Sequence, residues 1–494
     1  MKSEIQKPPD HRKERIGLVV GPVFAGLIYL LLPDTLAHEA RTLAAILTWV
    51  VVYWITEPIP IPITALLGTG LCVLTGLGSM KTVFSAYAHP IIFLFIGSFF
   101  LAEALTVHGL DKRFGIWLLS LKWVGMRPVR IFIAMGCAVA ALSMWISNTA
   151  AAALMLPIAL GVLTTIRGPH EGPTQFDTGF LLLVAYGAGV GGVVTIIGTP
   201  PNLIGVALLS EQANIDISFG TWMALGLPLG VFMLGVVSLY LLKLSPPPST
   251  IAGSGAMIEE QRVRLGQWSR GERNAFLGFS LAVVLWIVPG ILSASLGTDH
   301  AVVSWLKLHL PKELVPIIAA GLLFLLPINF QQRTFTLTWK QAVNINWGTI
   351  LLFGGGIAFG GLMVKTQLAY TIGEGLVGLF GVQSVWGLTA VAIGAAIILT
   401  ELASNTAAAS MLVPVVIAIA HAAGVSPLPP TLGACMGASL AFVLPVSTPP
   451  NAIVYGTGYV PITSMIRAGL ILDILGGIVI WVTLRLLCPL IGLS

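Results

Sequence analysis

Two short polar phrases each occur twice within apolar sequence, and both carry groups that can bind ions. Ser-Asn-Thr-Ala-Ala-Ala covers residues 147–152 and 404–409, and Thr-Pro-Pro-Asn covers residues 199–202 and 448–451. Hydroxyl and amide groups donate and accept hydrogen bonds, and two successive prolines remove backbone donors, so a helix must unwind at the second phrase. Paired interruptions of this kind are typical of transporters built from two repeats, whose binding sites lie at broken helices near the membrane midplane.

The sequence around these phrases lacks the basic side chains that often hold anions. No Lys or Arg occurs between Gly168 and Leu242 or between Thr366 and Ile466. An anion bound here must therefore be held by hydroxyls, side-chain amides, backbone N–H groups and helix N-termini. Each phrase begins a new helix, and a helix N-terminus leaves backbone N–H groups free, so four such termini can converge on one ligand.

The helical segments that end at these interruptions expose carbonyl oxygens, which suit a hard monovalent cation such as Na⁺. A further hydroxyl stands four residues before each serine of the first phrase, at Ser143 and at Thr400. Two matching sodium clusters are predicted, in which Gly198 and Ala403 act through backbone oxygens: Ser143, Ser147, Asn148 and Gly198 in one, and Thr400, Ala403, Asn405 and Ser447 in the other. Two or more cations would offset a divalent anion in a site without arginine.

The elements that carry these phrases must be membrane helices. The chain has 494 residues, of which 56% are apolar and only 9% are charged. Soluble domains carry about 25% charged residues, so this composition predicts an all-α polytopic membrane protein. The formal charge of +5 comes from basic residues between the spans, so it does not indicate nucleic-acid binding.

The apolar segments divide the chain into two halves with the same order of elements. Residues 1–15 form a basic tail, 16–244 a first repeat, 245–273 a polar linker and 274–494 a second repeat. The segments 131–166 and 385–420 are short for two crossings, so each is predicted to be a re-entrant hairpin with Ser-Asn-Thr at its tip. Residues 111–130 mix aromatic and basic residues, which predicts a helix in the membrane interface, with a plain loop as the alternative.

The basic residues give this layout an orientation. If each hairpin returns to the side from which it entered, most of the 25 Lys and Arg residues fall on the side of the basic tail. Cytoplasmic loops are enriched in Lys and Arg, so the N-terminus is predicted to be cytoplasmic and the C-terminus outside, in the plasma (inner) membrane. The first hairpin then enters from the cytoplasm and the second from outside, as an inverted repeat requires.

The paired phrases, with Ala88-His89-Pro90-Ile91-Ile92-Phe93-Leu94-Phe95 ahead of the first hairpin, resemble those of the divalent anion/sodium symporter (DASS) family along nearly the whole chain. This family contains di- and tricarboxylate and sulfate transporters. The resemblance implies about eleven transmembrane helices plus the two hairpins, a homodimer, and an elevator mechanism in which a transport domain slides past a scaffold domain. It implies Na⁺ as the coupling ion, a sodium site beside each hairpin tip and no organic cofactor. It also implies substrate contacts by Asn148, Thr149, Thr199, Pro200, Ser404, Asn405, Thr406, Thr448 and Pro449.

The leading hypothesis is a secondary active transporter of small dicarboxylates of the succinate, malate and fumarate type, powered by Na⁺ and surrounded by membrane lipids. A dicarboxylate exchanger and a transporter of sulfate or tricarboxylates stay open, because the phrases bind anionic ends without revealing what joins them. A membrane hydrolase that used Ser143 or Ser147 would need a base within reach, and no His occurs between His108 and His170. A channel would not need two symmetric occluded sites.

Glu401 is a separate candidate. It lies three residues before the second Ser-Asn-Thr, where the first hairpin has Met144. A carboxyl group inside the membrane is a functional candidate that could tune the Na⁺ affinity or carry a proton. The alternative is a structural hydrogen bond to the hairpin's own backbone.

Overall fold

The computed structural model describes residues 12–124, 127–167, 174–248, 254–297, 299–380 and 384–492. These residues are mostly helical, and ten of their helices are long and apolar enough to cross a membrane. The prediction of a helical polytopic membrane protein is therefore confirmed. The described residues also contain one short antiparallel pair of strands, β1 (Pro327–Asn329) and β2 (Thr334–Phe335), which the sequence did not predict. Most of the predicted basic tail, residues 1–11, lies outside the described residues.

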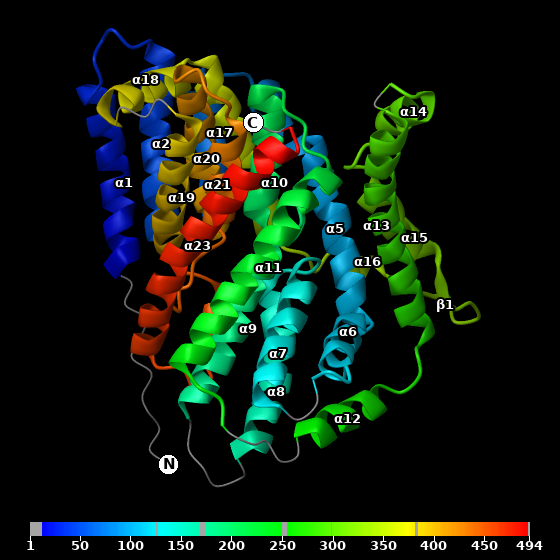
Figure 1. Cartoon of the computed structure of the whole chain (residues 1–494). Coiled ribbons are helices and arrows are strands. Elements are labelled where there is room, and N and C mark those ends of the chain that lie inside the picture. The colour runs from blue at the N-terminus through cyan, green and yellow to red at the C-terminus, as the bar shows by residue number, and fades with distance from the viewer. Residues whose placement is uncertain are drawn as a thin grey trace.

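The first half of the chain runs from α1 to α11 (Figure 1). Its elements are α1 (Arg12–Leu31), α2 (His38–Thr56), α3 (Ile61–Leu74), α4 (Met80–Phe84), η1 (Ser85–Ala88), α5 (Pro90–Val107), α6 (Leu110–Leu119), α7 (Pro128–Ser143), α8 (Asn148–Arg167), α9 (Gln175–Val194), α10 (Pro200–Ala213) and α11 (Phe219–Leu244). The start of α5 has a local cause: Pro90 needs no backbone donor in the first turn, and His89 Nδ1 accepts a hydrogen bond from the amide of Ile91 (3.3 Å).

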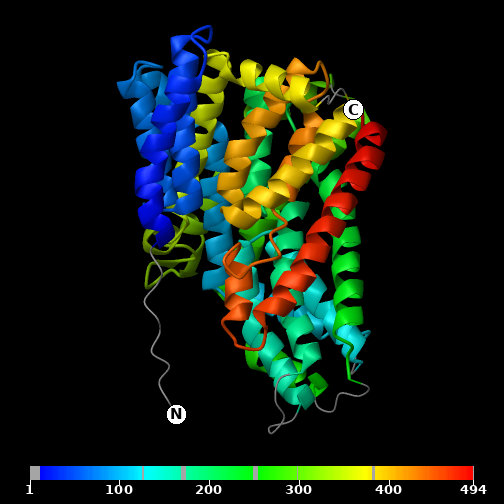
Figure 2. The same cartoon turned by 90° about the vertical axis from the view of Figure 1, so that its left-hand side faces the viewer.

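The second half runs from α13 to α23, after the linker helix α12 (Ser254–Leu265). Its helices are α13 (Arg270–Leu296), α14 (Ala301–His309), α15 (Val315–Leu325), α16 (Trp339–Ala342), α17 (Trp347–Lys365), α18 (Leu368–Phe380), α19 (Val385–Leu402), α20 (Asn405–Ala422), α21 (Leu428–Gly437), α22 (Pro449–Tyr455) and α23 (Ile462–Leu490). The long helix α23 runs obliquely along the molecule and ends at its upper end (Figure 2).

The same helix pairs pack together in both halves. Among the helices that carry neither repeated phrase, α2 packs on α3 and α13 packs on α15, while α3 contacts α17 and α15 contacts α5. Among the helices that flank the repeated phrases, α7 packs on α9 as α19 packs on α21, and α9 packs on α11 as α21 packs on α23. The centre of this arrangement is α9, of which 94% is buried, so helices surround it on every side.

The buried hydrophobic residues form two cores, which divide the helices differently. The larger core joins α5–α11 with α13, α15, α17 and α19–α23, and a smaller core gathers α2, α3, α17 and α18 against the second hairpin. Ala403 and Ala407, at the tip of that hairpin, belong to the smaller core. The second hairpin therefore contacts both cores, and its tip sits where they meet.

The linker is more ordered than its composition predicts. Helix α12 lies within the predicted linker, across the lower end of the molecule, and packs against α6 and α8 (Figure 1). Arg113 on α6 holds the chain after α12, because its guanidinium donates to Glu272 Oε1 (2.6 Å) and to the carbonyl oxygen of Leu265 (2.9 Å). Of residues 111–130, for which the sequence predicts an interface helix, only the first half is helical, as α6, and α7 begins at Pro128; the place of α6 in the membrane interface stays a prediction.

Candidate functional site

The first hairpin brings three oxygens together beside its tip. Helix α7 ends at Ser143 and α8 begins at Asn148. The Ser143 Oγ lies 2.8 Å from Asn148 Oδ1 and 2.7 Å from the carbonyl oxygen of Ala188 on α9. A hydroxyl has one hydrogen, so Ser143 can donate to only one of these two oxygens at a time. The side chain of Ser143 is fully buried, so this group of oxygens is screened from solvent.

The second hairpin repeats this geometry with a different hydroxyl. The Thr400 Oγ1 near the end of α19 lies 2.7 Å from Asn405 Oδ1 at the start of α20. It also lies 2.7 Å from the carbonyl oxygen of Ala438, directly after α21. Thr400 is fully buried as well. A hydroxyl, a side-chain carbonyl and a backbone carbonyl therefore converge once in each half, and all three are ligands that hard cations accept.

The Thr-Pro-Pro-Asn phrases are held open by their own asparagines. In both halves the side-chain amide donates to the carbonyl oxygens ten and seven residues earlier, at distances between 2.7 and 3.0 Å. The donors and acceptors are Asn202 with Gly192 and Thr195, and Asn451 with Ala441 and Leu444. These carbonyls have lost their helical partners where the chain unwinds, so each asparagine replaces the missing backbone donors.

The residues before each new helix cap it. Ser147 Oγ accepts a hydrogen bond from the amide of Ala150, and Ser404 Oγ accepts one from the amide of Ala407, both at 3.2 Å. Thr448 Oγ1 accepts from the amide of Asn451 at 3.4 Å. The backbone of Thr199 (φ −148°, ψ 145°) matches that of Thr448 (φ −142°, ψ 148°), but the Thr199 side chain makes no capping hydrogen bond.

The two halves differ at the residue after Ser143 and Thr400. In the first half, Thr195 Oγ1 donates to the backbone oxygen of Met144 (2.5 Å). In the second half, the carboxylate of Glu401 accepts hydrogen bonds from Ser447 Oγ (2.5 Å) and from the amide of Val443 (3.0 Å). The carboxylate of Glu401 therefore accepts its hydrogen bonds from the segment after α21. The alternative predicted a hydrogen bond to the backbone of the hairpin itself, and it is wrong.

Comparison with known proteins assigns the chain to a family. Residues 13–492 match the family described as the sodium:sulfate symporter transmembrane region, which is nearly the whole chain. The chain belongs to the sodium:sulfate symporter family. The resemblance to divalent anion/sodium symporters is thereby confirmed, and a membrane hydrolase or a channel no longer needs to be considered.

Individual relatives agree with this family assignment. The chain is 32% identical over 496 aligned residues to the sodium-dependent dicarboxylate transporter SdcS of Staphylococcus aureus, in strains bovine RF122 and USA300 among others. These alignments cover 98% of this chain and 93% of each relative. In structure, the chain is similar to the YdaH transporter of Alcanivorax borkumensis, with a TM-score of 0.55 over 85% of this chain and 88% of that one. The sequence identity is 14%, so this second likeness concerns the fold alone.

In this symporter-family chain the two half-sites interlock. Helix α8 of the first hairpin packs against α22 of the second half, and α20 of the second hairpin packs against α10 of the first. Asn148 also lies close to the end of α9 in its own half, because a Cβ added at Gly192 would lie 2.5 Å from Asn148 Oδ1. Each hairpin therefore packs against the helix that follows the unwound segment of the other half.

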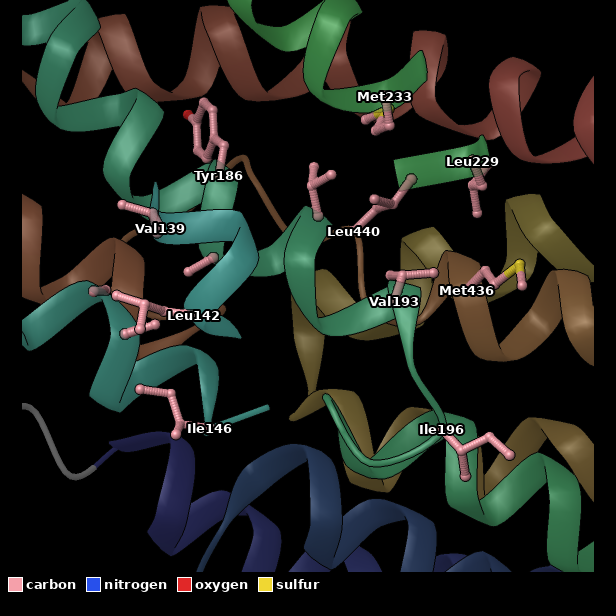
Figure 3. Packing of buried hydrophobic residues seen from close by; sticks show 14 of the residues in the cluster. Val139, Leu142, Ile146, Tyr186, Val193, Ile196, Leu229, Met233, Met436 and Leu440 are labelled. Atoms are coloured by element: carbon pink, nitrogen blue, oxygen red, sulfur yellow. The ribbon is translucent and has the colours of Figure 1, made fainter. Parts of the chain in front are cut away.

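The end of α9, beside the first unwound segment, lies in hydrophobic packing (Figure 3). Val193 and Ile196, which flank the end of α9, are buried among side chains from other helices. The labelled neighbours come from α7 and its turn, α11, α21 and the segment after it: Val139, Leu142, Ile146, Leu229, Met233, Met436 and Leu440. Polar groups in such surroundings must find partners within the site, which is why the hydrogen bonds described above recur in both halves.

The predicted substrate residues are accessible to different degrees. Thr199 is buried, whereas Pro449 is exposed; Ser147, which is predicted only as a sodium ligand, is exposed as well. The other predicted substrate residues are half-buried: Asn148, Thr149, Pro200, Ser404, Asn405, Thr406 and Thr448. Half-burial at a helix start leaves a side chain reachable by a ligand while its backbone stays fixed.

The predicted sodium residues are only partly brought together by direct contacts. The structure joins Ser143 with Asn148 and Thr400 with Asn405, as the sequence predicts. The hydroxyl of Ser147 instead caps α8. The remaining three predicted sodium residues lie in the turns and make other hydrogen bonds. Gly198 donates its amide to Thr195 O (3.4 Å), Ala403 donates its amide to Leu399 O (2.9 Å), and Ser447 donates its hydroxyl to Glu401.

The sequence did not predict two of the oxygens that meet at the hairpin tips. The carbonyls of Ala188 and Ala438 approach the hydroxyls of Ser143 and Thr400, but alanine carries no side-chain signal of such a role. Asn202 and Asn451 were visible as part of the repeated phrase, yet only the structure shows that they hold the unwound segments. The repetition of that phrase was the signal that could have marked them.

Proposed function

We propose that this chain is a Na⁺-coupled secondary transporter of C4-dicarboxylates such as succinate, malate and fumarate. The observation that carries the proposal is the equal oxygen geometry at the two hairpin tips, around Ser143 and around Thr400. The name of the Staphylococcus aureus relatives, which are sodium-dependent dicarboxylate transporters at 32% identity, supports the choice of ion and substrate.

The substrate is held without a basic side chain. Asn148 and Asn405 stand at the first turns of α8 and α20, and Thr199 and Thr448 precede α10 and α22. Amide and hydroxyl groups, together with the free backbone N–H groups at the starts of α8 and α20, donate hydrogen bonds to carboxylate oxygens. The full substrate set comprises Asn148, Thr149, Thr199, Pro200, Ser404, Asn405, Thr406, Thr448 and Pro449.

Sodium ions supply the positive charge that the substrate site lacks. One ion binds beside each hairpin tip, at the clusters Ser143, Ser147, Asn148 and Gly198, and Thr400, Ala403, Asn405 and Ser447. The carbonyls of Ala188 and Ala438 join these clusters, because each lies 2.7 Å from the central hydroxyl. Asn148 and Asn405 belong to both the sodium and the substrate sets, so binding of the ion orients the amide that meets the substrate.

The two halves form inverted repeats, and the chain works as an elevator in a homodimer. The recurrence of the same helix pairs in both halves supports the repeat, with hairpins over residues 131–166 and 385–420. The inner helices α7–α11 and α19–α23 make up the transport domain, and α1–α3, α5, α13, α15 and α17 make up the scaffold. The N-terminus is cytoplasmic and the C-terminus outside. The position of α12 and α6 together at one end of the molecule is consistent with a shared cytoplasmic side (Figure 1).

The test is uptake of radiolabelled succinate into proteoliposomes under two conditions. One has an inward Na⁺ gradient, and the other has no gradient but internal succinate. Uptake that requires the Na⁺ gradient is expected. Uptake that ignores Na⁺ and requires internal succinate would replace the symporter with an exchanger. If neither condition gives uptake, the same assay with sulfate and citrate identifies the anion, and the choice of C4-dicarboxylates is wrong.

A further inference from the structure

Asp473 on α23 is a buried acid that the proposed site does not use. It lies near the middle of a helix long enough to span a membrane, and only 3% of it is exposed. Neither of its carboxylate oxygens makes a hydrogen bond of normal geometry among the described residues, and the polar groups within reach are the carboxyl group of Glu401 and the backbone of Phe442. An isolated carboxylate in apolar surroundings is very unfavourable, so a buried acid within a membrane marks a functional site unless something neutralises it.

This acid faces the unwound segment of the second half. Gly469, four residues earlier and so on the same face of α23, touches that segment: an added Cβ would lie 2.2 Å from the carbonyl oxygen of Phe442. The amide of the next residue, Val443, donates to Glu401 Oε1. Asp473 and Glu401 interact electrostatically. Two carboxyl groups, from α23 and from the second hairpin, therefore meet at one segment of the chain.

The other groups that face this pair carry no positive charge. Tyr186 on α9 donates its hydroxyl to the carbonyl oxygen of Phe442 (2.9 Å), and it interacts electrostatically with both acids and with Tyr240 on α11. Tyr186 lies in the same packed interior as Met233 and Leu440 (Figure 3). No Lys or Arg occurs from Thr366 to Ile466.

The nearest basic residue on α23 itself is Arg467, which is exposed. It lies six residues before Asp473, so the two side chains leave the helix in different directions. No described side chain on the neighbouring helices therefore offers Asp473 a cation.

The first half has no such pair at the matching positions. Its hairpin carries Met144 where the second carries Glu401. On α11, Gly226 approaches the backbone of Val194 (2.4 Å from an added Cβ to the carbonyl oxygen), as Gly469 approaches Phe442 on α23. Four residues after Gly226 comes Gly230, at the place of Asp473. The second half thus has two acids where the first half has a methionine and a glycine.

We infer that Asp473, facing Glu401, binds one monovalent cation, Na⁺ or a proton, in addition to the ions at the two hairpin tips. The inference rests on the proposed function, because the cation is carried with the substrate. A buried carboxylate that faces a second acid and no cationic side chain attracts a cation strongly in a low-dielectric interior, and two neighbouring carboxylates share one more readily than either holds it alone. The site lies on the transport side of the molecule, so its ion moves with the second hairpin.

The experiment measures how far a gradient can concentrate succinate. Wild type and Asp473→Asn are reconstituted into liposomes whose voltage is held at zero with potassium and valinomycin. One arm applies a tenfold Na⁺ gradient at equal pH, and the other applies a pH difference of one unit at equal Na⁺. Each coupled cation multiplies the equilibrium accumulation by its own concentration ratio, so losing one cation lowers accumulation about tenfold in the arm that drives it.

A tenfold loss confined to the Na⁺ arm identifies Na⁺, and a loss confined to the pH arm identifies a proton. An Asp473→Asn protein that transports succinate with unchanged accumulation in both arms overturns the inference. Asp111→Asn is the matched control, because Asp111 on α6 is also buried (4% exposed) and has an oxygen without a partner, yet α6 packs against α5, α7 and α12 rather than against α23. This control should leave both arms unchanged.

Binding measurements keep the inference testable apart from transport. If the wild type moves no succinate, the proposed function fails, while the cation site can still be examined on purified protein. There, ²²Na⁺ binding should give one ion more for wild type than for Asp473→Asn, or the infrared spectrum should contain a protonated-carboxyl band that the variant lacks. If Asp473→Asn does not fold, Asp473→Glu should retain the extra ion or shift that band. Absence of both signals overturns the inference.

Discussion

In the first half of the site, Ser143 bridges Asn148 and the carbonyl of Ala188; in the second half, Thr400 bridges Asn405 and the carbonyl of Ala438. The distances agree within 0.1 Å, although a serine stands in one half and a threonine in the other. The methyl group of the threonine does not disturb the oxygen positions. What the two halves share is therefore the placement of three oxygens, which is the placement that the proposed sodium sites require.

The surroundings of these two oxygen groups are not alike. The first turn is tied by neutral groups, from Thr195 to the backbone of Met144. The second is tied by a carboxylate, because Ser447 and the amide of Val443 both donate to Glu401. Equal oxygen groups with unequal charges nearby should bind the same ion with different affinities, since a nearby carboxylate favours a cation. The second site is thus expected to be the tighter one.

The largest expected effect comes from the amide that serves both ion and substrate. Asn148→Ala or Asn405→Ala should abolish Na⁺-driven succinate uptake, because each change removes an oxygen from the sodium cluster and a donor from the substrate site. Loss of one buried hydrogen bond changes stability by only about 1–3 kcal/mol, so the variants should still fold. Uptake and size-exclusion profiles of both variants check this.

A matched control is Asn274→Ala on α13, where the side chain donates to Thr336 Oγ1 (2.8 Å) away from the hairpins. It should keep uptake near the wild-type level. Full activity in both Asn148→Ala and Asn405→Ala would refute the site assignment. Activity in only one of them would show that the two halves are not equivalent in binding substrate.

The next effect concerns the unwound segments rather than the ligands. Asn202→Ala leaves the carbonyl oxygen of Gly192 without its donor, and Asn451→Ala does the same to the carbonyl oxygen of Ala441. The second acceptor in each half, Thr195 O or Leu444 O, keeps a backbone amide donor, from Gly198 (3.4 Å) or from Ser447 (3.2 Å). An unsatisfied buried polar group costs about 1–3 kcal/mol, so both variants should unfold at clearly lower temperature than wild type. Asn202→Asp and Asn451→Asp keep the shape and lose the donor, so they should not restore stability. Thermal unfolding in detergent measures the difference, and an unchanged midpoint in either half would contradict it.

Much of this arrangement could be predicted from the sequence, because the repeated phrases mark chemistry that side chains carry. The matched spacing alone predicts that Ser143 lies beside Asn148 and Thr400 beside Asn405, and the structure brings both pairs within hydrogen-bond distance. The carbonyls of Ala188 and Ala438 could not be found, since a backbone oxygen becomes a ligand only through the path of the chain. The same limit explains α12, because its Pro/Ser/Gly-rich surroundings hide the fixed position that Arg113 gives to the following segment.

The partner of Glu401 shows a different limit. The sequence places this acid three residues before the second Ser-Asn-Thr, which indicates a role at the hairpin tip. Its hydrogen bonds go to Val443 and Ser447, more than forty residues later in the chain. Asp473 is further still, and in the sequence it is one acid in an apolar helix. Only the packing of α23 on the unwound segment brings the two acids together.

A smaller effect is expected from the hydroxyls at the centre of each oxygen group. Thr400→Val and Ser143→Ala remove one ligand oxygen and keep most of the volume. Each should raise the Na⁺ concentration needed for half-maximal uptake by about five- to thirtyfold, because one ligand contributes roughly 1–2 kcal/mol. The succinate concentration for half-maximal uptake at saturating Na⁺ should change much less. Thr400→Ser retains the oxygen and serves as the control.

An unchanged Na⁺ dependence in Thr400→Val would place the second cation elsewhere. If Thr400→Val shifts the Na⁺ dependence more than Ser143→Ala, the carboxylate of Glu401 makes the second site the dominant one. Equal shifts would mean that the charge of Glu401 is already neutralised by another cation. That outcome agrees with an ion held by Asp473, so this pair of variants also probes the environment of the buried acids.

The smallest effect should come from exchanging the residues that differ between the turns. Ser447→Gly gives the second half the residue of the first and removes one hydrogen bond to Glu401, for a loss of about 1 kcal/mol. The Na⁺ requirement should rise by only a few fold, because the amide of Val443 still holds the carboxylate. The reverse exchange, Gly198→Ser, should be worse, since an added Cβ lies 2.5 Å from the backbone oxygen of Gly192. Equal Na⁺ dependence for both variants would show that the two turns are interchangeable, and that the difference between the sites comes from Glu401 and Asp473 alone.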